Sequence, residues 1–109
     1  MFKTGTVNLP QATAAIAGGW DLETGTGIRT YLSPDIPFVE PWLIGTSPAF
    51  SGPPLVVLSL TGIVVFGGLA QVELTVENVQ AEEFNIRVVA FENCMLNRVQ
   101  VTWFAYDTA

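Results

Sequence analysis

Three segments in the second half of the chain alternate apolar and polar residues with a period of two. They are "QVELTVEN" (71–78), "FNIRVVAF" (84–91) and "RVQVTWFAY" (98–106). Because successive side chains of a β-strand point to opposite faces of a sheet, this alternation predicts three half-buried strands. The connections "VQAEE" and "ENCMLN" are too short for a parallel crossover, so they predict that consecutive strands are antiparallel neighbours.

The alternation also separates core residues from surface residues. In the last segment it places Val99, Val101, Trp103 and Ala105 on one face, against Gln100, Thr102, Phe104 and Tyr106 on the other. Trp103 is therefore expected in the core.

The most apolar run of the chain is "PPLVVLSLTGIVVFGG" (53–68), inside a stretch without charged residues between Glu40 and Glu73. A membrane helix needs about 20 consecutive apolar residues. Here the leading prolines, the central Thr61-Gly62 and the closing glycines interrupt the run. Its Val and Ile residues favour strand. We expect one long strand, or two short ones hinged at Thr61-Gly62, buried on both faces or against another subunit, and no insertion into a membrane.

The first half of the chain is rich in turn signals, such as "ETGTG" and "LSPDIP", and has room for a few short strands. Candidates are "TGTVNL" (4–9), "IRTYL" (28–32) and "WLIG" (42–45). Together with the later segments they predict a single all-β domain over residues 1–109, a six-stranded antiparallel β-sandwich. The N-terminus is a poor secretory signal, so a protein acting outside its cell would use another route.

Composition narrows the function classes. Only 13% of the residues are charged, against about 25% in an average soluble domain. We expect apolar surface to meet other copies; the alternative is a monomer with an unusually uncharged surface. The net charge of −6, with four scattered basic residues, argues against a nucleic-acid partner.

The rarer residue types argue against an enzyme and against a cofactor. Histidine is absent, which removes the commonest general base and metal ligand. The single cysteine, Cys94, forms no intrachain disulfide and is expected to be a small turn residue. Catalysis would depend on carboxylate pairs such as Glu82 with Glu83 or Glu73 with Glu77, which have the sequence context of solvated acids. We expect no enzymatic activity and no cofactor.

A series of motifs resembles the H-type lectin domain, the family of the snail agglutinins and of the C-terminal domain of slime-mould discoidins. They are "F-x-x-P-P-x-V" from Phe50, "LSLTG", "VELTVENVQAEEFNIRV", "FEN" and "VQVTWFAY", in this order. The resemblance implies a six-stranded antiparallel sandwich that forms a homotrimer through its strands. It also implies sugar sites at the protomer boundaries, with N-acetylgalactosamine and related galactosides as the usual ligands. A trimer would explain the shortage of charge.

The resemblance also implies a set of site residues. One protomer would supply Phe91, which takes the place of the family's tryptophan, and the polar residues Glu92, Asn93 and Asn97 that follow it. The neighbouring protomer would supply Gln71, which takes the place of an arginine. It would also supply Arg29 and Thr30 from an early loop. A sugar site needs an aromatic ring for the C–H face of the sugar and planar groups for its hydroxyls. Because several of these residues differ from those of the family's usual site, we expect this site to bind a different set of sugar hydroxyls. In the alternative interpretation, Phe91 is a packing residue and its polar neighbours form an ordinary turn.

Two functions remain open. The first is a trimeric carbohydrate-binding domain for galactoside or other cell-surface glycans, which gains avidity from several sites and serves cell adhesion or host attachment. The second is a structural spike, tip or fibre subunit of a phage or phage-like particle, with a host-attachment role and possible loss of sugar binding. Both predict a location outside the cell or on a particle surface.

Overall fold

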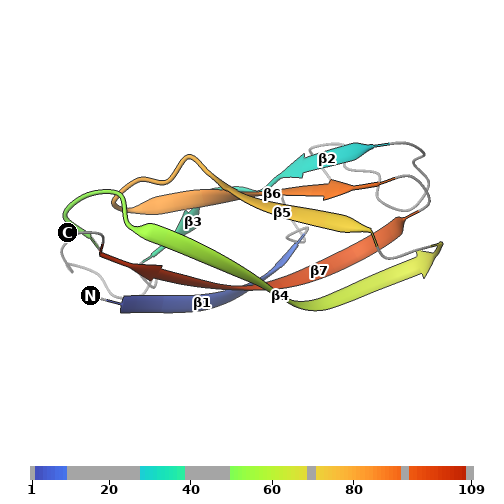
Figure 1. Ribbon diagram of the computed structural model, residues 1–109, viewed down its shortest axis with the longest axis horizontal. Coiled ribbons are helices and arrows are strands. Elements are labelled where there is room, and N and C mark those ends of the chain that lie inside the picture. Colours follow the sequence, from blue (N-terminus) through green and yellow to red (C-terminus); the bar gives the residue numbers. More distant parts are fainter. Residues whose placement is uncertain (1, 10–27, 39–49, 69–70, 92–93, 108–109) are drawn as a thin grey trace.

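The computed structural model describes residues 2–9, 28–38, 50–68, 71–91 and 94–107. Seven strands lie within these residues: β1 (Phe2–Leu9), β2 (Arg29–Leu32), β3 (Ile36–Pro37), β4 (Leu55–Gly67), β5 (Val72–Glu77), β6 (Glu83–Ala90) and β7 (Met95–Tyr106). They form a three-stranded sheet in the order β1-β7-β4, and a second sheet in which β6 pairs with β2, β3 and β5. Every pairing is antiparallel, and the two sheets pack as layers (Figure 1).

The prediction of an all-β antiparallel fold is confirmed, but the described residues contain seven strands where six were expected. The additional strand is β3, whose two residues pair with Phe84 and Glu83 of β6. It lies within "LSPDIP", and the prolines there are typical of a turn, which hides a short strand from pattern analysis. The expected strand "WLIG" lies outside the described residues.

The prediction that consecutive strands are neighbours holds for β5 and β6 and is wrong for β6 and β7. Strand β7 lies in the other sheet, between β1 and β4, which come from opposite halves of the chain. Strands β6 and β7 therefore lie in different sheets, and between them the Cys94 N–H donates a hydrogen bond to the Phe91 carbonyl at 2.9 Å. A short connection therefore joins the layers here, as it does at the corners of many sandwiches.

Strand β4 is continuous, with an irregularity where the hinge was expected. Its register against β7 shifts between Leu60 and Gly62 and again at two places near its end, which is the pattern of β-bulges. The strand is not buried on both faces within the protomer, because Leu55, Val57, Leu60 and Val64 are 40–47% exposed. Burial of this strand against another subunit stays a prediction.

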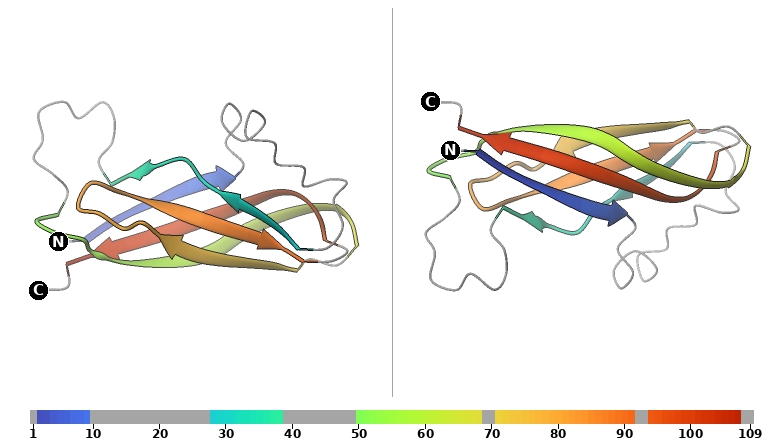
Figure 2. Two further views of the ribbon diagram at one scale, coloured as in Figure 1. Left: turned by 90° about the horizontal axis from the view of Figure 1, so that it is seen from above. Right: turned by 90° about the horizontal axis from the view of Figure 1, so that it is seen from below.

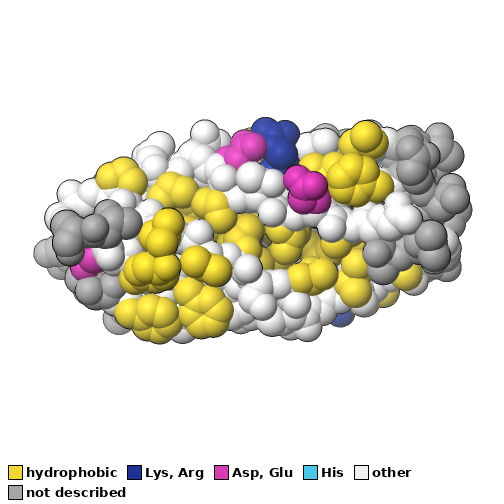
Figure 3. Space-filling model, viewed as in Figure 1, with side chains coloured by type: hydrophobic (Ala, Val, Ile, Leu, Met, Phe, Trp, Pro, Cys, Tyr) yellow, Lys and Arg dark blue, Asp and Glu magenta, His cyan; other side chains and the backbone are white. Residues whose placement is uncertain are grey.

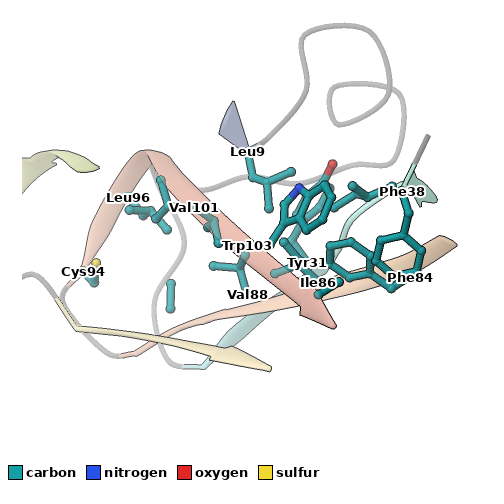
Figure 4. Close-up of a cluster of buried hydrophobic side chains, with 14 of the residues drawn as sticks. Leu9, Tyr31, Phe38, Phe84, Ile86, Val88, Cys94, Leu96, Val101 and Trp103 are labelled. Carbon is teal, nitrogen blue, oxygen red and sulfur yellow. The ribbon is translucent and has the colours of Figure 1, made fainter. Parts of the chain in front are cut away.

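The core lies between the sheets and follows the predicted alternation. Strands β6 and β7 supply most of it, with side chains that are at most 5% exposed: Phe84, Ile86, Val88, Ala90, Leu96, Val99, Val101, Trp103 and Ala105. The Trp103 indole meets the Phe38 and Phe84 rings edge to face, with centroids 5.5 Å away in each case (Figure 4). Such aromatic contacts add to the burial of apolar area, and the core assignment of Trp103 is confirmed.

A buried amide joins the short strand β3 to this frame. Asn85 of β6 is 7% exposed and donates to the Ser33 carbonyl at 3.1 Å and to Asp35 Oδ1 at 3.0 Å. Its own side-chain oxygen accepts a hydrogen bond from Asn78 at 3.1 Å. Because buried polar groups are costly unless they are hydrogen-bonded, this network fixes the 33–37 segment against β6.

Candidate functional site

The most promising surface lies at the end of the second sheet where β6 finishes and β5 begins. Phe91 directly follows β6 and Gln71 directly precedes β5. The Phe91 N–H donates to the Gln71 carbonyl at 3.0 Å, which extends the pairing of Val72 with Ala90 by one residue. Both side chains are half-buried. Two of the predicted site residues therefore adjoin within one protomer.

The register shows which side chains share a face with Phe91. Val88 and Ala90 point into the core, so Val89 and Phe91 point to the outside of the sheet. Val89 pairs with Thr30 on one side and with Glu73 on the other, and both of these residues are exposed. Side chains paired across strands lie about 5 Å apart and diagonal neighbours about 7–8 Å apart.

We call this group of residues the Phe91 surface: Phe91, Gln71, Val89, Thr30 and Glu73. It combines an aromatic ring with an amide, a hydroxyl and a carboxylate on one outer sheet face. Strands β2, β5 and β6 that carry it run side by side (Figure 2). A flat, partly apolar surface with planar polar groups beside a ring is suited to a ligand that has both C–H faces and hydroxyls.

The remaining predicted site residues are distributed differently. The backbone of Arg29 pairs with Ala90 at the same end of the sheet. Glu92 and Asn93 lie outside the described residues. Asn97 is a half-buried residue of β7, at a register shift between the pairs Val64–Arg98 and Val65–Leu96. It belongs to the other sheet and so does not share a sheet face with Phe91.

Cys94 positions the end of the site without contributing chemistry to it. Its side chain is fully buried, and its backbone N–H holds the Phe91 carbonyl. The expectation of a small residue at a turn agrees with this geometry. Cys94 thus fixes where the chain leaves Phe91 to enter the other sheet.

Two acidic residues near the Phe91 surface, Glu77 and Glu73, differ in whether an arginine pairs with them. Arg87 donates from Nε and Nη2 to the two carboxylate oxygens of Glu77, with an Nη2–Oε2 distance of 2.8 Å. This hydrogen-bonded ion pair lowers the pKa of Glu77 and raises that of Arg87. Glu73, on the same outer face, has no ion-pair partner among the side chains that the structure describes.

A second carboxylate group lies at the opposite end of β6. The hydrogen bond between Asp35 and Glu83 raises the pKa of Glu83, while the Asn85 amide, and then Glu83, lower the pKa of Asp35. Glu83 therefore interacts with Asp35 as well as with Glu82. Asp35 and Glu83 lie where the 33–37 segment meets β6, at the far end from Phe91.

Within the described ranges, no three Asp, Glu or Cys side chains come together in a way that could hold a metal ion. No helix in the same part of the chain has the length and apolar character to cross a membrane.

Glu73 was not among the predicted site residues, and Glu73 and Glu77 were both expected to be exposed acids. Glu73 is exposed, whereas Glu77 is half-buried and paired with Arg87. The available signal was the two-residue spacing of Gln71 and Glu73, which puts both on one strand face. The diagonal position of Glu73 relative to Phe91 follows only from the register between β5 and β6.

Comparison with known protein families and structures gives matches to this chain. The profile of the family described as "H-type lectin domain" matches residues 47–106, more than half of the chain, including β4 to β7 and the sequence between Gln71 and Phe91. No curated protein sequence matches the chain.

The fold is similar to that of discoidin II from the slime mould Dictyostelium discoideum. Two solved structures, of the native recombinant and the wild-type protein, each superpose with a TM-score of 0.72 at 18% sequence identity. The superposition covers 96% of this chain and 36% or 35% of the discoidin II chain, so the chain spans about a third of the length of discoidin II. Together with the profile match, these findings establish that the chain belongs to the H-type lectin domain family.

Proposed function

We propose that this chain is a non-enzymatic carbohydrate-binding domain and that the Phe91 surface is part of its glycan site. The observation that carries the proposal is the juxtaposition of Phe91 with Gln71 on one sheet face, in a chain of a lectin family. The Phe91 ring would contact the C–H face of a sugar, because aromatic rings provide large apolar contact area at little cost in conformational freedom.

Polar groups around the ring would select the sugar. The Gln71 amide offers both donors and an acceptor, and the Thr30 hydroxyl offers one donor and acceptor lone pairs. Glu92, Asn93, Asn97 and Arg29 remain proposed contributors, from the adjoining loop, the other sheet and the β2 end. Galactosides and N-acetylgalactosamine-type glycans are the first ligands to test, with other cell-surface glycans beside them, because the polar residues differ from those that the family resemblance implies.

A homotrimer is the proposed assembly, and the outer face of the β1-β7-β4 sheet supports it. Phe2 and Leu55 both pair with Tyr106, and Val57 pairs with Phe104. We call these five residues the apolar patch. Phe2, Leu55 and Val57 are 60%, 47% and 45% exposed, and Phe2 stacks on Phe104 with ring centroids 5.9 Å apart. Figure 3 shows hydrophobic side chains gathered over the beginning of β4 and the adjoining ends of β1 and β7.

The polar groups next to the apolar patch are already hydrogen-bonded to one another. Thr102 Oγ1 lies 3.1 Å from Thr6 Oγ1 and 3.3 Å from Thr61 Oγ1. Thr61 also donates to the Gln100 side-chain oxygen at 3.2 Å. If another copy of the chain covers these hydrogen-bonded side chains, few of their hydroxyl groups are left without a partner. The free-energy cost of burying them is therefore low. The face also carries no charge at these positions, so identical acidic copies meet there with little repulsion.

The second candidate, a structural spike, tip or fibre subunit of a phage or phage-like particle, draws support from the same apolar patch. A surface suited to other copies is also suited to a subunit of a larger particle. Both candidates act outside the cell or on a particle surface, in adhesion or host attachment. They differ in whether the chain binds sugars by itself.

A glycan array followed by isothermal titration calorimetry tests the proposed function. The expected result is binding of at least one glycan class at sub-millimolar to millimolar concentration per site, strengthened by multivalent display. Native mass spectrometry of the same sample gives the number of copies. Co-assembly with other particle proteins together with no glycan binding at millimolar concentration would favour the structural subunit.

A further inference from the structure

The Phe91 surface carries a carboxylate that has no ion-pair partner among the described side chains. Glu73 is exposed, lies diagonal to Phe91 and is paired with Val89. The nearest described cation on this face, Arg87, is engaged by both oxygens of Glu77. Glu73 therefore places a carboxylate beside the ring, and it is one of the ten acidic residues that give the chain its net charge of −6.

Building on the glycan-binding function proposed above, we propose that Glu73 is a specificity-determining residue, which makes the Phe91 surface prefer uncharged glycans to anionic ones. An ionised carboxylate accepts hydrogen bonds from sugar hydroxyls, and two adjacent hydroxyls can donate to its two oxygens. The same carboxylate has no hydrogen to donate to a carboxylate or sulfate on a glycan. Its charge repels such groups.

The position of Glu73 sets the size of the effect. A sugar stacked on Phe91 places its substituents over the neighbouring side chains, and diagonal neighbours on a sheet are about 7–8 Å apart. At this separation in a largely aqueous environment, repulsion between two unit charges weakens binding by about threefold, and by about tenfold where the ligand excludes part of the water. Salt weakens the repulsion, because the screening length is about 10 Å at 0.1 M ionic strength.

The test compares each glycan with its anionic counterpart. The neutral ligand is the galactoside oligosaccharide that the array identifies, and its partner is the same oligosaccharide carrying a carboxylate or a sulfate. Calorimetry gives the affinity of both for the wild-type chain, for Glu73→Gln and for Glu82→Gln. Glu82 is an exposed acid before β6, at the other end of the sheet, so its variant removes the same net charge far from Phe91.

We expect the wild-type chain to bind the neutral ligand about threefold to tenfold more tightly than the anionic one. Glu73→Gln should remove this preference. It should also weaken binding of the neutral ligand by about tenfold, because a charged hydrogen-bond acceptor is lost. Glu82→Gln leaves both values within twofold of wild type. Circular dichroism and thermal unfolding of the variants confirm that their fold is intact.

Two results overturn the inference while leaving the proposed function in place. One is equal affinity of the wild-type chain for the neutral and the anionic ligand. The other is the same change in preference for Glu73→Gln and Glu82→Gln, which would assign the effect to net charge alone. Absence of binding to any neutral or anionic glycan overturns the proposed function and this inference together.

Discussion

A glycine under the Trp103 indole gives the sharpest test of the packing described above. A methyl group added at Gly5 of β1 would lie 2.6 Å from Trp103 Cζ2 and 2.8 Å from Nε1, where ordinary contacts are 3.4–4 Å. The indole has little room to retreat, because the Phe38 and Phe84 rings contact it edge to face. Gly5→Ala therefore forces the indole, β1 or both aromatic neighbours to move.

The expected cost follows from these contacts. Overpacking a well-filled core costs about 1–3 kcal/mol. Replacing glycine by alanine also lowers the conformational entropy of the unfolded chain, which stabilises the folded state by about 0.4–1 kcal/mol. The net destabilisation is then about 1–2 kcal/mol, which corresponds to a fall in melting temperature of roughly 4–10 °C for a domain of this size.

Chemical denaturation at a fixed protein concentration measures the effect, since association of copies adds to apparent stability. Gly52→Ala is the matched control, because a methyl group there meets no atom within 4 Å, and it should be neutral or slightly stabilising. In Gly62→Ala the added methyl group would lie 3.2 Å from Gln100 Cβ. The stability of this variant should therefore lie between those of Gly5→Ala and Gly52→Ala. If Gly5→Ala and Gly52→Ala unfold at the same denaturant concentration, the indole does not lie over β1 as described.

Two further predictions concern assembly and pH. Val57→Lys puts a charge into the apolar patch and should convert the proposed trimer into monomers, as measured by native mass spectrometry. The control Gln80→Lys, in the β5–β6 turn, should leave the trimer intact. A wild-type monomer, or a trimer that survives Val57→Lys, would contradict the proposed assembly. Because Arg87 lowers the pKa of Glu77 from its usual 4.5, the stability from this pair is present above pH 4.5 and is lost as pH falls through the lowered pKa. Urea unfolding between pH 7 and pH 3 should therefore show a smaller acid loss for Glu77→Gln than for wild type, and equal losses would refute the role of the pair.

The sequence predicted the local features of the fold and not its long-range order. Alternation in 98–106 correctly placed Trp103 inside, because the direction of a side chain depends only on its position in a strand. The position of β7 between β1 and β4 was not predictable in this way, since it depends on contacts between opposite halves of the chain. A short connection is compatible both with a hairpin and with a corner between sheets, and alternation does not distinguish them.

The same distinction applies to the candidate site. The family resemblance pointed to Phe91 and Gln71, and the structure brings them together in one chain through the register of β5 and β6. The resemblance assigned Gln71 to the neighbouring protomer, because it carried over a site between chains. The resemblance gave Glu73 no role in the site, and only the cross-strand geometry places it beside the ring.

Calorimetry with a monovalent sugar tests most directly whether the chain binds glycans through Phe91. The ligand is the best monovalent glycan from the array, titrated into wild type, Phe91→Ala and the control Val64→Ala, which shortens an exposed apolar side chain on the other sheet, outside the apolar patch. We expect Phe91→Ala to weaken binding by at least about tenfold, as loss of a central aromatic contact does, and Val64→Ala to stay within twofold. Unchanged affinity of a folded Phe91→Ala chain would contradict the account.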